Sequence, residues 1–290
     1  MAGSVAGAAL APVLRAGTGI FCQGYSASLV PNDDAQYAVT RVGGRMVLET
    51  STVASLPRPT LPLQLYEFEG CPFCRKVREA INILDLDVLM YPAPQGGTVY
   101  RPEAIEKGGK KMFPYLVDPN TDQAMYESDD IIAYLFDTYG GGRENVPLAL
   151  RMGAVTALTA GLAMLPRMGK GSRAVEGRAQ PPAEPLVYYG YEPSPFCKVV
   201  RESLNELELP HLWVTTARGS PARQALYERL GRVTLSFPYL EDPNTGVKMF
   251  ESADIVEYLN ETYGPDRKTG KKVMEEVVVE GEAIASGNVE

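Results

Sequence analysis

Two short motifs hold the residues whose chemistry is most specific in this chain. The first is Cys71-Pro72-Phe73-Cys74, and a near copy occurs at Ser194-Pro195-Phe196-Cys197. Two thiols two residues apart can form and break a disulfide, whereas a single thiol needs a partner from elsewhere. The first motif therefore predicts a dithiol redox centre, and the second predicts a hydroxyl beside a lone thiol.

Cys71 follows an apolar run and precedes a helical pattern, so we expect it where a strand meets a helix N-terminus. The unpaired N–H groups and the helix dipole there stabilise a thiolate and lower the thiol pKa. Arg75 and Lys76 add positive charge nearby. Cys71 is then the nucleophile, and Cys74 resolves a mixed disulfide on Cys71. The alternative is that both cysteines are inert residues of a core.

The elements that position these motifs occur twice. The apolar runs Leu63–Phe68 and Leu186–Tyr191 suit buried strands, and one motif follows each run. Each unit continues as helix, strand, short helix, strand, strand and helix, with serine expected as the N-cap of the last helix. The later matches are residues 113–116 with 237–240, 118–121 with 242–245, 127–128 with 251–252, and Gly140 with Gly264.

Each unit resembles a thioredoxin-fold domain of the glutaredoxin and glutathione-transferase N-terminal kind. The resemblance rests on the Cys-Pro-Phe-Cys motif after a strand, the Phe-Pro pair and the Glu-Ser pair, and it covers about residues 61–264. The whole arrangement is similar to a plant and algal plastid family with two such domains in tandem. It implies an α/β fold class, with two tandem thioredoxin-like domains joined by an apolar helical linker.

The resemblance also implies a glutathione site in the first unit. Pro114 is expected to form a cis peptide bond that faces the thiol, and the backbone of Phe113 to pair with the cysteinyl part of glutathione. Glu127 and Ser128 are expected to hold the γ-glutamyl end at a helix N-terminus, which favours anions. Asp129 either binds the glutathione ammonium or neutralises the helix dipole. The alternatives are a strand-edge proline and a helix cap without a ligand.

The second unit lacks the nucleophile. A serine hydroxyl is not ionised near neutral pH, so the dithiol cycle is lost there. Ser194 either donates a hydrogen bond to a glutathione thiolate, as serine does in some transferases, or belongs to a degenerate domain used for packing or recognition, which we favour. Cys197 is then a buried core thiol or a lone redox site. The equivalent residues of this unit are Ser194, Cys197, Phe237, Pro238, Glu251 and Ser252.

Composition excludes several classes of function. The 290 residues carry a net charge of -8, and nucleic-acid binding usually requires a basic patch, so no nucleic-acid partner is expected. Four cysteines and one histidine, with a single C-x-x-C, supply only half of a four-cysteine zinc site, so no metal is expected. No secretory signal is visible, and the cysteine spacing is not that of a secreted disulfide framework.

The N-terminal sequence predicts the location of the protein in the cell. Residues 1–32 contain no acid, one arginine, and much Ala, Gly and Ser, which is typical of an organelle transit peptide, and the low basic content favours the chloroplast, in the stroma or at the thylakoid. The alternative is a disordered tail. The predicted divisions are a transit peptide and flexible extension (1–60), the first domain (61–142), an apolar helix and linker (143–185), the second domain (186–264) and a tail (265–290).

The segment Pro147–Leu165 is apolar and has small residues every fourth position. Such spacing allows close helix packing in membranes or in soluble cores, and the basic residues that follow suit an anionic surface. The uncharged run is shorter than the ~20 residues of a spanning helix. We expect first a helix packed between the two domains, then a helix on a membrane surface, then a true span.

We therefore predict a glutathione-dependent thiol–disulfide oxidoreductase, with glutathione as co-substrate and a protein disulfide or a glutathionylated protein as partner. Cys71 and Cys74 are its catalytic residues. The alternatives are a non-catalytic binding or assembly protein at a plastid membrane, and a glutathione transferase-like protein. A weaker one is iron–sulfur ligation by Cys71 with glutathione from two subunits.

Overall fold

The computed structural model describes residues 5, 8–10, 13, 15, 18–162 and 165–265, so the predicted C-terminal tail lies outside the described residues beyond its first residue. The repeat predicted from the sequence is confirmed. The first unit consists of β4 (Leu63–Glu67), α2 (Pro72–Leu84), β5 (Val88–Pro92), α3 (Tyr100–Gly108), β6 (Tyr115–Asp118), β7 (Gln123–Met125) and α4 (Ser128–Tyr139). The second consists of β8 (Leu186–Gly190), α7 (Pro195–Glu206), β9 (His211–Thr215), α8 (Pro221–Arg229), β10 (Tyr239–Asp242), β11 (Val247–Phe250) and α9 (Ser252–Tyr263).

The two units share one eight-stranded sheet. Its strand order is β11-β10-β8-β9-β5-β4-β6-β7, so the units meet edge to edge where β5 pairs with β9. This pairing is antiparallel, and Leu89 lies opposite Leu212, with Val88 opposite Trp213 and Met90 opposite His211. Because Leu63 and Leu186 start equivalent parallel pairs with Val88 and His211, this register relates the two units by a pseudo-twofold axis between Leu89 and Leu212.

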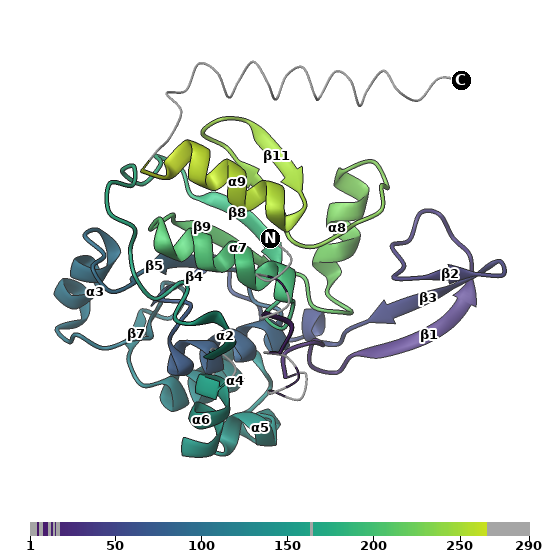
Figure 1. Cartoon of the computed structure of the whole chain (residues 1–290). Helices are drawn as coiled ribbons and strands as arrows, with labels where there is room; N and C mark the ends of the chain where they lie inside the picture. The colour runs from purple at the N-terminus through teal and green to yellow at the C-terminus, as the bar shows by residue number, and fades with distance from the viewer. Residues whose placement is uncertain are drawn as a thin grey trace.

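Helices on one face of the sheet form a core that is continuous across both units. Helix α2 contacts α4, and α7 contacts α9 in the same way. Their apolar side chains, together with those of the central strands, belong to one buried cluster. Helices α3 and α8 lie towards the opposite ends of the molecule (Figure 1). The first turns of α2 and α7 lie beside the seam between the units, where Lys198 pairs with Glu69 and Arg75 pairs with Glu192.

The N-terminal segment differs from the flexible extension expected up to residue 60. A small antiparallel sheet of β1 (Ser26–Pro31), β2 (Arg41–Val42) and β3 (Arg45–Thr50) projects from the body, followed by the short η1 (Val53–Ser55) (Figure 1). Cys22 and Val53 pack against Ala217 of the second unit. The segment is ordered because its apolar side chains and backbone groups find partners in both units, which composition alone does not indicate.

The apolar segment between the units forms two short helices rather than one. They are α5 (Leu148–Arg151) and α6 (Ala154–Leu162), followed by the short η3 (Leu165–Arg167), and Gly153 between them has a φ of +51°. Helix α6 packs on α2 of the first unit, while Val155, Leu158 and Leu162 remain exposed. Of the two domains between which this segment was expected to pack, α6 contacts the first through α2. In the ranges that the structure describes, no helix has the length and apolar character needed to cross a membrane.

Two segments of the chain, one before β1 and one after η3, each contact both units in an equivalent way. Arg15 pairs with Glu79 on α2, and the N–H of Cys22 donates to the carbonyl of Arg218 in the second unit at 3.3 Å. In the same manner Arg167 pairs with Glu202 on α7, and the N–H of Ala174 donates to the carbonyl of Gln95 in the first unit at 2.9 Å. The linker part of the predicted segment 143–185 thus contains one of two equivalent segments that contact both units. The repeat therefore extends further towards the N-terminus than the sequence motifs indicate.

Candidate functional site

Cys71 lies at the position predicted for the nucleophile. It is the N-cap of α2, and Pro72 occupies the first helical turn. Its Sγ accepts a hydrogen bond from the backbone N–H of Cys74 at 3.2 Å and lies 3.9 Å from the carbonyl oxygen of Phe113. The residue is 4% exposed. A sulfur that caps a helix N-terminus receives the partial positive charge of the unpaired N–H groups there.

The two thiols of the motif have opposite acidities. Burial opposes ionisation of Cys71, but hydrogen bonds from the side chain and backbone of Cys74 outweigh it and lower the pKa of Cys71. Burial raises the pKa of Cys74 well above its ordinary value, and the hydrogen bond to Cys71 adds to this effect. Since the thiolate is the reactive form of a cysteine, Cys71 is the more readily ionised and more reactive thiol of the two.

The Phe113-Pro114 pair lies beside the Cys71 thiol, as the resemblance implies. The Phe113–Pro114 peptide bond is cis, as is Phe237–Pro238 in the second unit. The ring of Phe113 lies under the guanidinium of Arg101, at 4.6 Å from ring centroid to Cζ. Burial lowers the pKa of Arg101, and the charges of Cys74 and Cys71 oppose this lowering. Arg101 is a cation beside the thiols that sequence reasoning missed.

The start of α4 differs by one residue from the sequence prediction. Glu127, not Ser128, is the N-cap, and Ser128 is the first helical residue. The reason is that Glu127 has a φ of +66°, which turns the chain into the helix one residue early; Glu251 does the same at +65°. Non-glycine residues with positive φ concentrate at functional sites. Asp129 is paired with the buried Lys76 at 2.5 Å, so its carboxylate is engaged within the protein.

The second unit keeps the backbone of the site but covers it. Ser194 Oγ accepts from the N–H of Cys197 at 3.2 Å, as Cys71 does from Cys74. Arg223 lies 5.1 Å from the ring of Phe237 and is the spatial counterpart of Arg101. Arg223 is 6% exposed and donates to the hydroxyl of Tyr37 at 3.2 Å. The loop before β2 therefore covers Arg223, whereas Arg101 in the first unit is half-buried.

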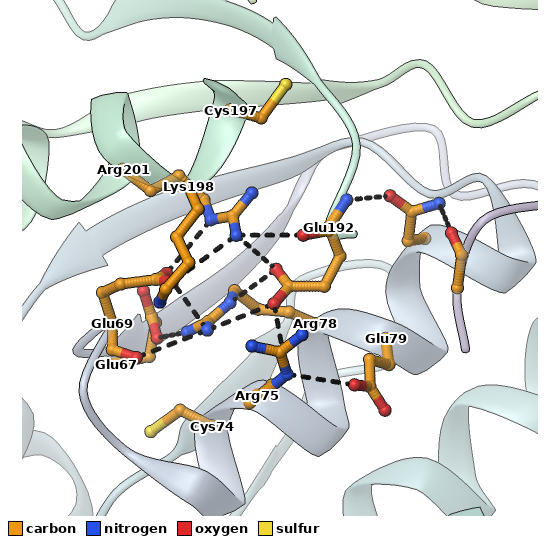
Figure 2. A network of polar contacts seen from close by, with 12 residues as sticks. Glu67, Glu69, Cys74, Arg75, Arg78, Glu79, Glu192, Cys197, Lys198 and Arg201 are labelled. Atoms are coloured by element: carbon orange, nitrogen blue, oxygen red, sulfur yellow. Dashed lines mark hydrogen bonds and ion pairs between the residues drawn. The ribbon is translucent and has the colours of Figure 1, made fainter. Parts of the chain in front are cut away.

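A buried charge network lies beneath both motifs at the seam (Figure 2). Glu69 and Glu192 precede the two motifs at equivalent positions, and each binds arginines of both units. Glu69 pairs with Arg78 and Arg201, both at 3.0 Å; Glu192 pairs with the same two arginines at 2.9 and 3.1 Å. All four side chains are at most 1% exposed. The seam therefore fixes the first turns of α2 and α7 relative to each other.

Comparison with known proteins gives the same assignment for both units. The sequence pattern described as "Glutathione S-transferase, N-terminal domain" matches the chain twice, over residues 65–143 and 189–267, which together make up more than half of it. The chain belongs to the glutathione S-transferase N-terminal domain family. No curated protein matches.

The family assignment confirms the tandem thioredoxin-like fold predicted from the sequence. Among solved structures, the chain is similar to the Bombyx mori glutathione transferase BmGSTD1, with 26% identity, a TM-score of 0.26 and coverage of 29% of this chain. It spans 38% of the length of that structure. The two family matches make the protein a glutathione-related protein of thioredoxin fold. Within the described residues, no group of three or more His, Cys, Asp or Glu side chains is placed to hold a metal ion.

In the first unit, only some of the site residues predicted from the motifs are in direct contact with one another. The sulfur of Cys71 contacts the backbone of Cys74 and of Phe113. Glu127 and Ser128 start α4, and Glu251 and Ser252 start α9 of the second unit in the same way. Arg101, Glu67 and the seam network were missed. Identical residues at repeat spacing, Glu69 with Glu192 and Arg78 with Arg201, were a visible signal for the network.

Proposed function

We propose that the chain is a glutathione-dependent thiol–disulfide oxidoreductase whose one redox centre is Cys71–Cys74. A single observation carries the proposal: the Cys71 sulfur caps α2 and accepts the Cys74 N–H, which lowers the pKa of Cys71 while that of Cys74 is raised. An inert pair of core cysteines needs no such difference. Family membership supports glutathione as the partner of this thiol.

The proposed reaction is removal of glutathione from a glutathionylated protein. The Cys71 thiolate attacks the glutathionyl sulfur, a Cys71–glutathione disulfide forms, and the protein thiolate leaves and takes a proton from solvent. A second glutathione, as thiolate, then attacks this mixed disulfide, which returns Cys71 as thiolate and releases oxidised glutathione. Alternatively Cys74 loses its proton and attacks the Cys71 sulfur, so that the internal disulfide forms and glutathione leaves as thiolate; two further glutathione molecules then reduce the internal disulfide and leave as oxidised glutathione. The backbone of Phe113 and the start of α4 at Glu127 and Ser128 are proposed to orient the tripeptide.

Steady-state reduction of a glutathionylated peptide, coupled to glutathione reductase, tests this function. We expect Cys71→Ser to abolish turnover and Cys74→Ser to retain it, because glutathione itself can resolve the mixed disulfide. Cys197→Ser is the matched control, since it removes a buried thiol at the same position of the second unit. Full activity of Cys71→Ser would refute the proposal.

A transferase-like role of the second unit is the other candidate. The observation that favours it is the geometry of Ser194, whose oxygen caps α7 by accepting the Cys197 N–H, as a serine that stabilises a bound thiolate would. Tyr37 covers Arg223 in the same unit, so we rank this role second. Conjugation of an aromatic electrophile by Cys71→Ser protein, lost in the Cys71→Ser, Ser194→Ala double variant, would support it.

Location in the plastid and contact with a membrane surface are also proposals. The acid-free N-terminal sequence supports the first. The exposed Val155, Leu158 and Leu162 on α6 support the second, because apolar side chains on one helix face suit the boundary of a bilayer. Import into isolated chloroplasts and co-sedimentation with anionic vesicles test them, and a Leu158→Glu variant that sediments equally would exclude contact through α6.

A further inference from the structure

A pocket of about 550 Å³ lies in the second unit, between α8 and the strands β8 and β9. The loop before β5 and the segment after η1 close it on the side of the first unit. Its volume is within the range of small-molecule sites, about 300–1,000 Å³. The residues that line it lie outside both cysteine motifs, both Phe-Pro pairs and both Glu-Ser pairs. The function proposed above therefore does not use this pocket.

Three tyrosine rings occupy the equivalent space in the first unit. Strand pairing places Tyr91 opposite Tyr66, and the two rings stack with centroids 4.7 Å apart and 20° between their planes. Tyr100 of α3 adds a third ring, with its centroid 5.0 Å from that of Tyr91. In this unit the protein thus fills the space between the sheet and α3 with its own aromatic side chains.

The second unit keeps only the first of these rings. Tyr189 lies opposite Val214, at the register position where the first unit has Tyr91. On α8, Ala222 takes the place of Tyr100, one residue before the arginine that both helices share. Both smaller side chains line the pocket. Protein interiors are close-packed, so the loss of two large side chains leaves a space that something else can fill.

The ring of Tyr189 has room for a stacked partner. Cζ of Arg229 lies 5.4 Å from its centroid, and Nζ of Lys107 lies at the same distance of 5.4 Å from that of Tyr66. Because Tyr66 accommodates both a cation and a stacked ring, Arg229 does not block the equivalent place on Tyr189. Arg229 also pairs with Glu241 at 2.5 Å, so its charge is engaged within the protein.

The wall beside this space is acidic in the second unit and apolar in the first. The antiparallel register of β5 and β9 places Asp87 beside Val214 and, by the same count, Pro210 beside Tyr91. Neighbours across a strand pair lie close enough for their side chains to interact. Asp85 lines the pocket as well. A group that fills the pocket therefore meets two carboxylates where Tyr91 meets a proline.

The charge of Asp87 is incompletely balanced. Removal from water and the charge of Asp85 raise its pKa to about 6. A backbone hydrogen bond from Thr215 and the charge of Arg58 oppose this rise. Arg58 donates to the backbone carbonyl of Leu84 at 2.8 Å, which holds it on the chain rather than on the carboxylate. A positive group beside Asp87 would stabilise the ionised carboxylate.

We propose that the pocket binds a small aromatic cation. Its ring stacks on Tyr189, where the first unit has the ring of Tyr91, and its positive group faces Asp87. The chemical class is an amine with one or two aromatic rings, because the space corresponds to two tyrosine side chains. The site is independent of the redox function, so failure of glutathione turnover would leave this result standing, and the reverse also holds.

Tyramine is the probe, because it carries the tyrosine ring together with an ammonium group. Isothermal titration calorimetry on the full chain measures its affinity, and we expect a dissociation constant of ~1 mM or below. Para-hydroxyphenylacetate has the same ring with a carboxylate, and butylamine has the ammonium without the ring. Both should bind about tenfold or more weakly than tyramine. Equal affinity of tyramine and either control ligand, or no binding of tyramine, would overturn the proposal.

Two substitutions that the repeat supplies test the place of the ring. Val214→Tyr and Ala222→Tyr each restore a ring of the first unit, and each should weaken tyramine binding by about tenfold or more because the space is then occupied. Glu228→Tyr is the matched control, since it adds the same side chain to an exposed position of α8 that does not line the pocket. Unchanged binding in both pocket variants, or an equal loss in Glu228→Tyr, would contradict the proposed place.

Asp87→Asn tests the positive group with a side chain of the same shape at an exposed position, so the fold is retained. Tyramine should bind this variant about tenfold more weakly, whereas para-hydroxyphenylacetate should bind it at least as well as wild type. Asp130→Asn, which removes an exposed acid from the first turn of α4, is the control and should leave both affinities unchanged. Tyramine affinity that is equal in Asp87→Asn and wild type would overturn the proposal.

Discussion

Arg78 on α2 and Glu192 in the second unit form a buried ion pair across the seam, with 2.9 Å between Nε and Oε2. The reciprocal pair, Arg201 with Glu69, has 3.0 Å between Nε and Oε2. Together with Leu89 opposite Leu212, these contacts join two domains of one family into a single body with pseudo-twofold symmetry. The two units differ in the residues at the motif: Cys71 of the first corresponds to Ser194 of the second, and Glu67 corresponds to Gly190.

The seam network should dominate the stability of the joined units. Arg201→Met leaves Glu69 and Glu192 with fewer cations in a buried site, so we expect the free energy of unfolding to fall by about 3 kcal/mol or more. Urea unfolding followed by circular dichroism measures it. Arg229→Met is the control, because the Arg229–Glu241 pair is partly exposed and should contribute less than about 1 kcal/mol. Equal losses in the two variants would contradict the importance of the seam.

Cys71 should be the most acidic thiol of the protein. Because its pKa is lowered, its thiolate persists to lower pH than that of an unstructured cysteine peptide, and iodoacetamide should modify it first as pH rises from 5 to 9. In Cys74→Ser the pKa of Cys71 should change, since a hydrogen bond from the Cys74 side chain helps to lower it. Mass spectrometry of tryptic peptides locates the alkylated residue. First modification at Cys22, whose pKa burial raises, would be inconsistent with this assignment.

Tyr37 should keep glutathione away from the second unit. Its hydroxyl accepts from Arg223, and Gln224 of α8 binds the same loop through its contact with the N–H of Tyr37 at 2.6 Å. We expect Tyr37→Ala to add a second, weaker glutathione site, measured by isothermal titration calorimetry. Val42→Ala, at the exposed β2, is the control and should leave the stoichiometry unchanged. A wild-type protein that already binds glutathione at both units would show that the loop is no barrier.

His211 should destabilise the fold in mild acid. It is the single histidine, and burial lowers its pKa from 6.5 to about 4. Since the unfolded state binds the proton more tightly, stability falls as pH drops from about 6.5 towards 4. Asp87 acts in the opposite direction, because burial raises its pKa to about 6 and the folded state then takes up the proton.

The two contributions can be separated with a substitution that the repeat supplies. His211→Val, which copies Val88 of the first unit, should gain about 2 kcal/mol relative to wild type between pH 7 and pH 5. Denaturant unfolding at both pH values measures this difference. A difference between variant and wild type that does not change with pH would show that His211 titrates normally.

Prediction from sequence succeeded where a pattern is local. The strands before the motifs, the prolines in the first helical turns and the glycines that end α4 and α9 follow from spacing alone. It failed at Ser128 by one residue, because a positive φ at Glu127 is not visible in composition. It also treated residues 1–60 as a transit peptide and flexible extension. The order of the described part of this segment was not predicted, since its partners lie in both units and far along the chain.

The sequence by itself determined the repeated fold and the type of chemistry, because residue identity at Cys71, Cys74 and Ser194 decides whether a disulfide can form. The tertiary structure decided which groups act on those residues. Arg101 from α3 and Glu192 from the second unit reach the first motif only through the tertiary fold, and burial changes the pKa of Glu67 without altering its sequence neighbours. The joined sheet likewise depends on an edge-to-edge register between β5 and β9, and no periodicity within either strand specifies its partner.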